Sequence, residues 1–253
     1  MSTGAAASHS QRAPQLSGQT VVVIGGSAGM GLETARQARA EGAKLVLTGR
    51  NPERLQRAAD ELEAQTTSAF DASDDGALAQ FFRDLPGPID HVMVTAGRPT
   101  YGRMLEMDLA EVRAAIDEHL IMYIQVARYA TPKMKPGGSL VFLGGTGSRR
   151  PGIGLGIAST ITVALPSLIA NLALEVMPIR VNLIAAGFVD TPLSAELLGD
   201  ELENRRKQLR DTNPIRRVVE SADVAALAVH LMTNTALTGA TYDIDGGQSL
   251  VAR

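Results

Sequence analysis

Short apolar, β-branched runs alternate with longer helical patterns along almost the whole chain. The apolar runs lie at 20–24, 44–48, 68–70, 91–95, 139–143, 179–184 and 240–244. Between them lie helical patterns such as 31–42, which ends at Gly42, and 109–129, which opens with a capping-box-like Asp108 and Glu111. Strands separated by helices pair in parallel through right-handed crossovers, and strands that are apolar throughout are buried on both faces. The alternation therefore predicts an α/β fold with a doubly wound parallel sheet.

The chain has 253 residues, about the size of one large α/β domain, and shows no internal repeat or interdomain linker. Residues 1–17 are small and polar and lack the apolar stretch of a secretory signal. We expect 1–17 to be a disordered tail and 18–253 to form a single dinucleotide-binding domain.

Composition argues against several kinds of site and partner. The chain has no cysteine, which excludes disulfides, thiolate metal sites and cysteine nucleophiles, and its four histidines show no ligand spacing, so no metal is expected. A net charge of −3 gives no broad attraction to nucleic acid or to a membrane surface. No apolar run approaches the roughly 18 residues that span a bilayer. The lack of cysteine fits a cytoplasmic location.

A glycine-rich turn, "IGGSAGMG" at 24–31, joins the first expected strand to the first helix. Gly25, Gly29 and Gly31 allow a tight turn, close approach of a pyrophosphate and close helix packing. The helix N-terminus would then face the phosphate charge. This pattern predicts a dinucleotide site of the Rossmann type.

Residues after the next strands refine this site. Arg50 follows the second strand, where an NAD enzyme would place a carboxylate on the ribose 2′-hydroxyl, so a 2′-phosphate and hence NADP(H) is favoured. Asp71 ends the third strand, where its carboxylate could accept a hydrogen bond from the adenine amino group. "TAG" at 95–97 ends the fourth strand with small residues that let a cofactor pass.

These motifs resemble the short-chain dehydrogenase/reductase family. The glycine spacing, "FDASD" at 70–74, "TAG" in place of N-N-A-G, "RVNLIAAGFVDTPL" at 180–193 and "TGATYDIDGGQSLV" at 238–251 carry the resemblance over roughly residues 18–251. It implies that the cofactor is lined by Gly25, Ser27, Gly29, Met30, Gly31, Arg50, Asp71, Ala96, Gly97, Val189 and Thr191. Family members are commonly homotetramers or dimers, here through helices at about 109–129 and 157–176.

The catalytic residues of that family are not found at the matching positions. The family uses an Asn, a Ser, a Tyr and a Lys; here the Ser position falls on Gly145 and the Asn position on His119. The Tyr and Lys positions become Ala158 and Thr162 in one register, or Gly156 and Thr160 in the other. Tyr129 and Lys133 have the right mutual spacing but precede the fifth strand.

His119 is the one expected pocket residue that titrates near neutral pH, as a proton donor or as a structural histidine. Thr146 and Ser148 would supply a hydroxyl in place of the missing serine, or serve the turn. We expect NADPH-dependent reduction of a small apolar acceptor, with an activated C=N or C=C favoured over a plain ketone. A catalytically silent NADP(H)-binding sensor or regulator, or a non-redox isomerase, is the alternative.

Overall fold

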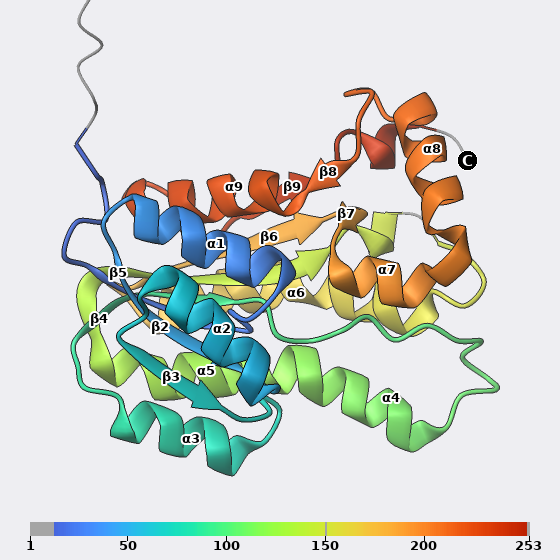
Figure 1. Ribbon diagram of the computed structural model, residues 1–253. Coiled ribbons are helices and arrows are strands. Elements are labelled where there is room, and N and C mark those ends of the chain that lie inside the picture. The colour runs from blue at the N-terminus through green and yellow to red at the C-terminus, as the bar shows by residue number, and fades with distance from the viewer. Residues whose placement is uncertain (1–12, 150, 252–253) are drawn as a thin grey trace, which may run out of the picture.

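The computed structural model describes residues 13–149 and 151–251 (Figure 1). It confirms the predicted Rossmann-type architecture, a seven-stranded parallel sheet in the order β3-β2-β1-β4-β5-β6-β9. The strands, in that order, are Thr66–Ala69, Lys44–Gly49, Thr20–Ile24, Ile89–Val94, Met134–Gly145, Arg180–Ala186 and Thr241–Ile244. Two short strands, β7 (Val189–Asp190) and β8 (Val219–Glu220), pair separately.

Alternate residues of each central strand point to opposite faces of the sheet, and both faces are covered. Val21 and Val23 of β1 belong to one buried cluster and Val22 and Ile24 to the other, all fully buried. The first cluster is completed by α1 (Gly29–Ala40), α2 (Pro52–Leu62) and α9 (Ser221–Thr233). The second is completed by α3 (Asp75–Asp84), α4 (Leu109–Ile116), α5 (Met122–Ala130) and α6 (Gly156–Glu175). This two-sided burial explains the uninterrupted apolar strands.

Two further helices, α7 (Pro192–Leu198) and α8 (Leu202–Thr212), follow β7 and lie beyond the end of the sheet (Figure 1). They replace the single polar helical region expected from the sequence, because Gly199 at φ +49° ends α7 and a short 3₁₀ turn follows.

The expected helix 109–129 is interrupted. A π-helical turn, Asp117–Ile121, separates α4 from α5, and Asp108 caps α4 by accepting a hydrogen bond from the Ala110 backbone N–H at 2.8 Å. Turns of this kind are rare and occur often at functional sites. This one carries His119.

The expected boundary between tail and domain, at residue 17, is wrong, because the last residues of the expected tail belong to the domain. Leu16 is fully buried, and its backbone N–H donates to the Glu41 carbonyl at 2.9 Å. The folded domain therefore begins before residue 18, whereas residues 1–12 of the expected tail lie outside the described residues.

α6 also corrects the expectation that no apolar run approaches the length needed to span a bilayer. Its 20 residues are long and apolar enough to cross a membrane by length and composition alone, since its few Ser, Thr and Asn residues do not offset the aliphatic ones. Leu165 and Ile169 on its inner side are fully buried in the core, whereas Val163 and Leu174 are 65% and 67% exposed. The helix is thus part of the domain core on one side and uncovered on the other.

Candidate functional site

The glycine turn lies where the chain leaves β1 beside β4, the point at which the strand order of the sheet reverses. A Cβ on Gly31 would lie 2.2 Å from the Gly25 carbonyl oxygen and 2.4 Å from Thr95 Oγ1, so no larger residue fits. Gly25 adopts φ +93°, a conformation that L-residues rarely take. Thr95 Oγ1 donates to the Gly25 carbonyl at 3.2 Å and ties the end of β4 to this turn.

Two adjoining hollows open at this end of the sheet. The first, called the cleft below, has a volume of about 210 Å³, and the second, called the cavity, about 490 Å³. Ten of the eleven expected cofactor residues line the cleft: Gly25, Ser27, Gly29, Met30, Gly31, Arg50, Asp71, Ala96, Gly97 and Thr191. Val189 lines the cavity instead. The hollows share Met30, Thr95, Ala96, Gly97, Thr191 and Leu193, so a molecule in the cleft would reach the cavity.

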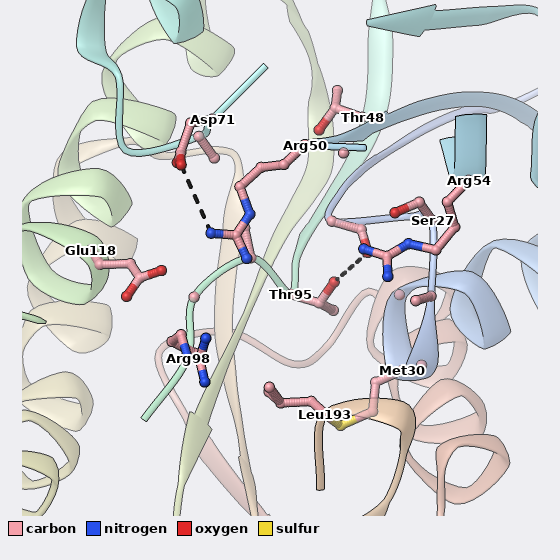
Figure 2. A pocket seen from close by; sticks show the side chains of 18 of the residues that line it. Ser27, Met30, Thr48, Arg50, Arg54, Asp71, Thr95, Arg98, Glu118 and Leu193 are labelled. Atoms are coloured by element: carbon pink, nitrogen blue, oxygen red, sulfur yellow. Dashed lines mark hydrogen bonds and ion pairs between the residues drawn. The ribbon is translucent and has the colours of Figure 1, made fainter. Parts of the chain in front are cut away.

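At one end of the cleft, Arg50 faces Asp71 (Figure 2). Arg50 Nη1 lies 3.8 Å from Asp71 Oδ2, while Asp71 Oδ1 accepts hydrogen bonds from the Ser73 backbone N–H at 3.0 Å and from Ser73 Oγ at 2.6 Å. Burial would raise the pKa of Asp71, but the Ser73 hydrogen bonds and the Arg50 charge outweigh it and lower that pKa. Asp71 therefore carries a negative charge and holds Arg50 in the cleft.

The cleft contains charged residues that the sequence analysis did not identify. Arg54, in the first turn of α2, lines it together with Arg98, Glu118 and Glu196. Arg98 follows Gly97, and its Nη2 lies 3.4 Å from Glu196 Oε1 on α7. The motifs gave no signal for these residues: Arg98 lies just outside the T-A-G motif at 95–97, and Arg54, Glu118 and Glu196 lie on helical segments that the tertiary fold brings to the glycine turn.

His119 lies between the π turn and the end of β4. It lines the cavity, and its Nε2 would be 3.2 Å from a Cβ built on Gly97, so only glycine leaves this side of the ring open. Its Nδ1 lies 3.0 Å from the Ala115 carbonyl oxygen, an acceptor only, so Nδ1 carries the proton. In the neutral ring, Nε2 then presents a lone pair toward Gly97.

Three hydroxyl-bearing residues of the cavity lie near the expected serine position. Thr146 lines the cavity as expected; Ser159 and Thr162 also line it. Ser148 does not, and its backbone N–H donates to Thr162 Oγ1 at 3.0 Å, which corrects the expectation for Ser148. Ser159 Oγ donates to the Gly147 carbonyl at 3.1 Å. Ser159 lies on α6 and not at the strand end where the family's serine is found, so its sequence position gave no signal.

The two possible registers for the missing Tyr and Lys differ in the structure. Ala158 and Thr162 line the cavity, whereas Gly156 and Thr160 do not. A Cβ on Gly156 would meet Met104 Sδ at 2.2 Å, so this position is covered by the loop after β4. The cavity wall at the first register is therefore formed by a methyl group and a threonine.

The phenols close to the cavity differ in availability. Tyr123 is fully buried and its hydroxyl donates to the Leu143 carbonyl, and burial raises its pKa. Tyr101 lines the cavity on the loop after β4 and is 55% exposed. Tyr129 and Lys133 lie elsewhere: the Tyr129 hydroxyl donates to Asp75 and the Lys133 ammonium to the Arg83 and Leu85 carbonyls.

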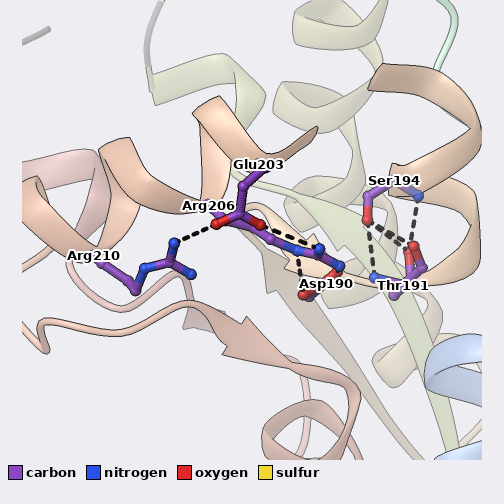
Figure 3. A network of polar contacts seen from close by, with 6 residues as sticks. All are labelled: Asp190, Thr191, Ser194, Glu203, Arg206 and Arg210. Carbon is purple, nitrogen blue, oxygen red and sulfur yellow. Dashed lines mark hydrogen bonds and ion pairs between the residues drawn. The ribbon is translucent and has the colours of Figure 1, made fainter. Parts of the chain in front are cut away.

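The segment that covers the cavity is fixed by a polar network (Figure 3). Thr191 and Ser194 form a capping box at the start of α7. Arg206 on α8 binds Asp190 through two hydrogen bonds of 2.8 Å, and Glu203 joins Arg206 to Arg210. Because Asp190 precedes Thr191, this network sets the position of a residue that lines both hollows.

Comparisons with known proteins cover almost the whole chain. A family model described as enoyl-(acyl carrier protein) reductase matches residues 24–249. The short-chain dehydrogenase/reductase ATR9 of Stachybotrys chlorohalonatus is 26% identical, covering 94% of this chain and 99% of the relative. The NADP-dependent (R)-specific alcohol dehydrogenase of Lentilactobacillus kefiri is 29% identical, over 92% and 97%.

A solved structure, that of a small-chain dehydrogenase in complex with NADPH, superposes with a TM-score of 0.79 at 25% identity. It covers 92% of this chain and 100% of the other. The matches extend from the glycine turn to the last strand and thus include every element that forms the two hollows. The chain belongs to the short-chain dehydrogenase/reductase family of oxidoreductases.

Proposed function

We propose that this protein is an NADP(H)-dependent oxidoreductase with a non-standard active site, which reduces a small apolar acceptor. The observation that carries the proposal is the pairing of the glycine turn and Arg50 in the cleft with a cavity lined by Ala158 and Thr162, the positions that we match to the family's Tyr and Lys. The relatives that act with NADP or bind NADPH support the choice of cofactor.

The cleft suits a phosphorylated dinucleotide. Gly25 and Gly31 leave the space that a Cβ would fill, the N-terminus of α1 faces it, and Arg50 lies at the end of β2. Ala96, Gly97 and Thr191 would hold the nicotinamide half where cleft and cavity meet, and Asp71 would accept from the adenine amino group. When bound, the reduced cofactor supplies a hydride.

The cavity suits an acceptor that needs little help from an acid. Ala158 cannot donate a proton, and Thr162 cannot supply the positive charge that lowers the pKa of a neighbouring phenol. A positioned general acid contributes about 3–5 kcal/mol, whereas holding two reactants together contributes about 7–11 kcal/mol. The cleft and the cavity would still supply the contribution that comes from holding the two reactants together.

The missing acid ranks three classes of acceptor by how much the reduction of each depends on a proton donor. An iminium carbon that takes a hydride becomes a neutral amine and needs no further proton. An activated alkene becomes an enolate, which takes a proton from water or from His119 in its protonated form. A plain ketone becomes an alkoxide, the strongest base of the three, and depends most on an acid. The described residues that line the cavity carry no carboxylate, in keeping with an apolar acceptor.

Two measurements test the proposal. Titration by fluorescence should show tighter binding of NADPH than of NADH; equal affinity, or no binding of either, would contradict the cofactor assignment. NADPH absorbance followed with cyclic imines, enones and ketones should then fall fastest with imines. Ala158 and Thr162, at the positions matched to the family's Tyr and Lys, also favour a second candidate, a silent NADP(H)-binding sensor or regulator, or an isomerase on the same scaffold. Tight NADPH binding without oxidation across the panel would support that candidate.

We further propose a homotetramer or dimer in the cytoplasm, acting on small molecules. Exposed apolar residues support the assembly. Val163 and Leu174 on α6 and Ile121 in the π turn are large apolar residues that a single domain leaves exposed.

A further inference from the structure

The lining of the cavity is largely apolar but contains an arginine. Among the described residues that line it, Arg205 on α8 is the only one that carries a permanent charge, and none is a carboxylate. Arg205 does not line the cleft, whereas Thr191 and Leu193 line both hollows. The positive charge therefore belongs to the part of the site that would hold the acceptor, and not to the part that would hold the dinucleotide.

Arg205 packs against a phenylalanine of the same cavity. Its guanidinium carbon lies 5.8 Å from the centroid of the Phe188 ring, and its Nη1 donates a hydrogen bond to Gln208 Oε1 at 2.7 Å. The side chain is partly buried, whereas Lys207 on the same helix is exposed. Phe188 and Gln208 are neutral, so these two contacts orient the guanidinium without cancelling its charge.

Gln248 meets the same phenylalanine through the backbone. It lines the cavity, and its Oε1 accepts a hydrogen bond from the Phe188 backbone N–H at 3.0 Å. A Cβ on Gly187 would lie 3.0 Å from that oxygen and 2.6 Å from Asp245 Cβ, so glycine is needed for this approach. Within the described part of the chain, Gln248 Nε2 donates no hydrogen bond. Its two N–H donors are thus fixed in direction and available.

The acid that precedes Gln248 in the chain is turned to other partners. Asp245 is buried and does not line the cavity. Its Oδ1 accepts from the Gly247 backbone N–H and its Oδ2 from the Ser249 backbone N–H, both at 2.8 Å. Its charge therefore stabilises the turn that carries Gln248 and does not face an acceptor.

We propose that Arg205 and Gln248 form a subsite for an anionic group, so that the acceptor is an apolar molecule with one carboxylate. The Arg205 guanidinium would donate to one carboxylate oxygen and Gln248 Nε2 to the other, while the Phe188 ring contacts the apolar body. The inference rests on the proposed function and names its substrate class. No proton or electron moves at this subsite, which serves to orient the acceptor.

The test compares two probes that differ in one charge: a pyrroline that carries a carboxyethyl group, and the methyl ester of the same pyrroline. Calorimetry with saturating NADP⁺ gives their dissociation constants without hydride transfer, and NADPH absorbance then gives their turnover. Arg205→Met keeps the aliphatic contact with Phe188 and removes the charge. Gln248→Glu keeps the oxygen that accepts from the Phe188 N–H and replaces the donor. Lys207→Met is the matched control, because Lys207 is exposed and does not line the cavity.

The wild type should bind the acid about 10-fold or more tightly than the ester, the range of a charge-assisted hydrogen bond. Arg205→Met and Gln248→Glu should each remove this preference and change ester binding less than about 2-fold, and Lys207→Met should behave as wild type. Unchanged NADPH binding shows that each variant is folded, since neither residue lines the cleft.

Equal binding of acid and ester by the wild type, or a preference that survives Arg205→Met, would overturn the subsite. Equal weakening of both probes by Arg205→Met would also overturn it, because Arg205 would then only support the packing of α8. If the acid binds more tightly but neither probe oxidises NADPH, the subsite stands and the proposed reduction fails. If both probes oxidise NADPH with equal KM, the reduction stands and the subsite fails.

Discussion

At the scale of single residues, the protonation of His119 decides what it can do. Its Nδ1 proton is held by the Ala115 carbonyl, so the neutral ring only accepts a hydrogen bond at Nε2. A proton can leave from Nε2 only when the ring is doubly protonated. His119 would therefore act as an acid in its imidazolium form and as an acceptor otherwise.

We predict that His119→Ala lowers kcat for an enone or ketone by at most the general-acid range, about 10²–10⁴-fold. It should lower kcat for a cyclic iminium acceptor by less than about 10-fold, because hydride transfer completes that reduction. Steady-state kinetics with saturating NADPH measures both. If the wild type reduces ketones efficiently and His119→Ala abolishes this activity, His119 replaces the family's tyrosine as the acid, and the prediction is wrong.

A second histidine, His91 on β4, should affect stability against pH. It is buried between Ser139 Oγ at 2.8 Å and Gln19 Oε1 at 2.7 Å. Burial lowers its pKa to about 4, with Asp90 opposing the shift and Arg180 and Lys135 adding to it. Unfolding restores a pKa near 6.5, so the unfolded chain binds the proton first as the pH falls. The contribution of His91 to the free energy of unfolding is then constant above about pH 6.5 and decreases between about 6.5 and 4.

We expect up to about 3 kcal/mol to be lost across this window, an upper bound that follows from the pKa difference. Urea unfolding at pH 7.5 and pH 4.5 measures it. His91→Gln should lower stability at pH 7.5 but reduce the difference between the two conditions. His230→Gln on the exposed side of α9 is the control. If the stability difference between pH 7.5 and pH 4.5 is the same in His91→Gln as in the wild type, other groups cause the acid sensitivity.

At the scale of elements, α8 is held to β7 by the two hydrogen bonds between Arg206 and Asp190. Arg206→Ala should loosen α7 and α8 and raise the KM for NADPH several-fold through Thr191, with a smaller change in kcat. Global stability should change little, since the pair is partly exposed. Limited proteolysis within 191–213, with and without NADPH, gives a direct measure. Arg210→Ala, which loses only its contact with Glu203, should cleave at the wild-type rate.

The strands and the cofactor turn could be predicted from sequence because each has a local cause. Each of the seven apolar runs overlaps one of the seven strands of the sheet, and Gly25, Gly26 and Gly31 are required by contacts within a few ångströms. The π turn at 117–121 had no such signal, because its one-residue insertion leaves the apolar pattern nearly unchanged. Arg54 and Ser159 were missed for another reason: the tertiary fold decides which turn of α2 faces the cleft and which turn of α6 faces the cavity, and spacing does not encode this.

At the scale of the whole molecule, one side of α6 remains to be explained. A helix that packs on a sheet needs one apolar stripe, and Leu165 and Ile169 supply it. Val163 at 65% exposure and Leu174 at 67% lie outside that stripe. Burying such side chains contributes about 1.5–3 kcal/mol each, so a second subunit covering α6 would gain free energy that a monomer forgoes.

We therefore predict that light scattering at micromolar concentration gives the mass of a dimer or tetramer. Val163→Glu should shift the protein toward the monomer, because a carboxylate in an apolar interface costs several kcal/mol, while an outward-facing change leaves the fold intact. Leu105→Glu, on the loop after β4 where Leu105 is fully exposed, is the matched control and should keep the assembly. Circular dichroism confirms that both variants are folded. A wild-type chain that scatters as a monomer would contradict the assembly and leave the apolar side of α6 to another partner.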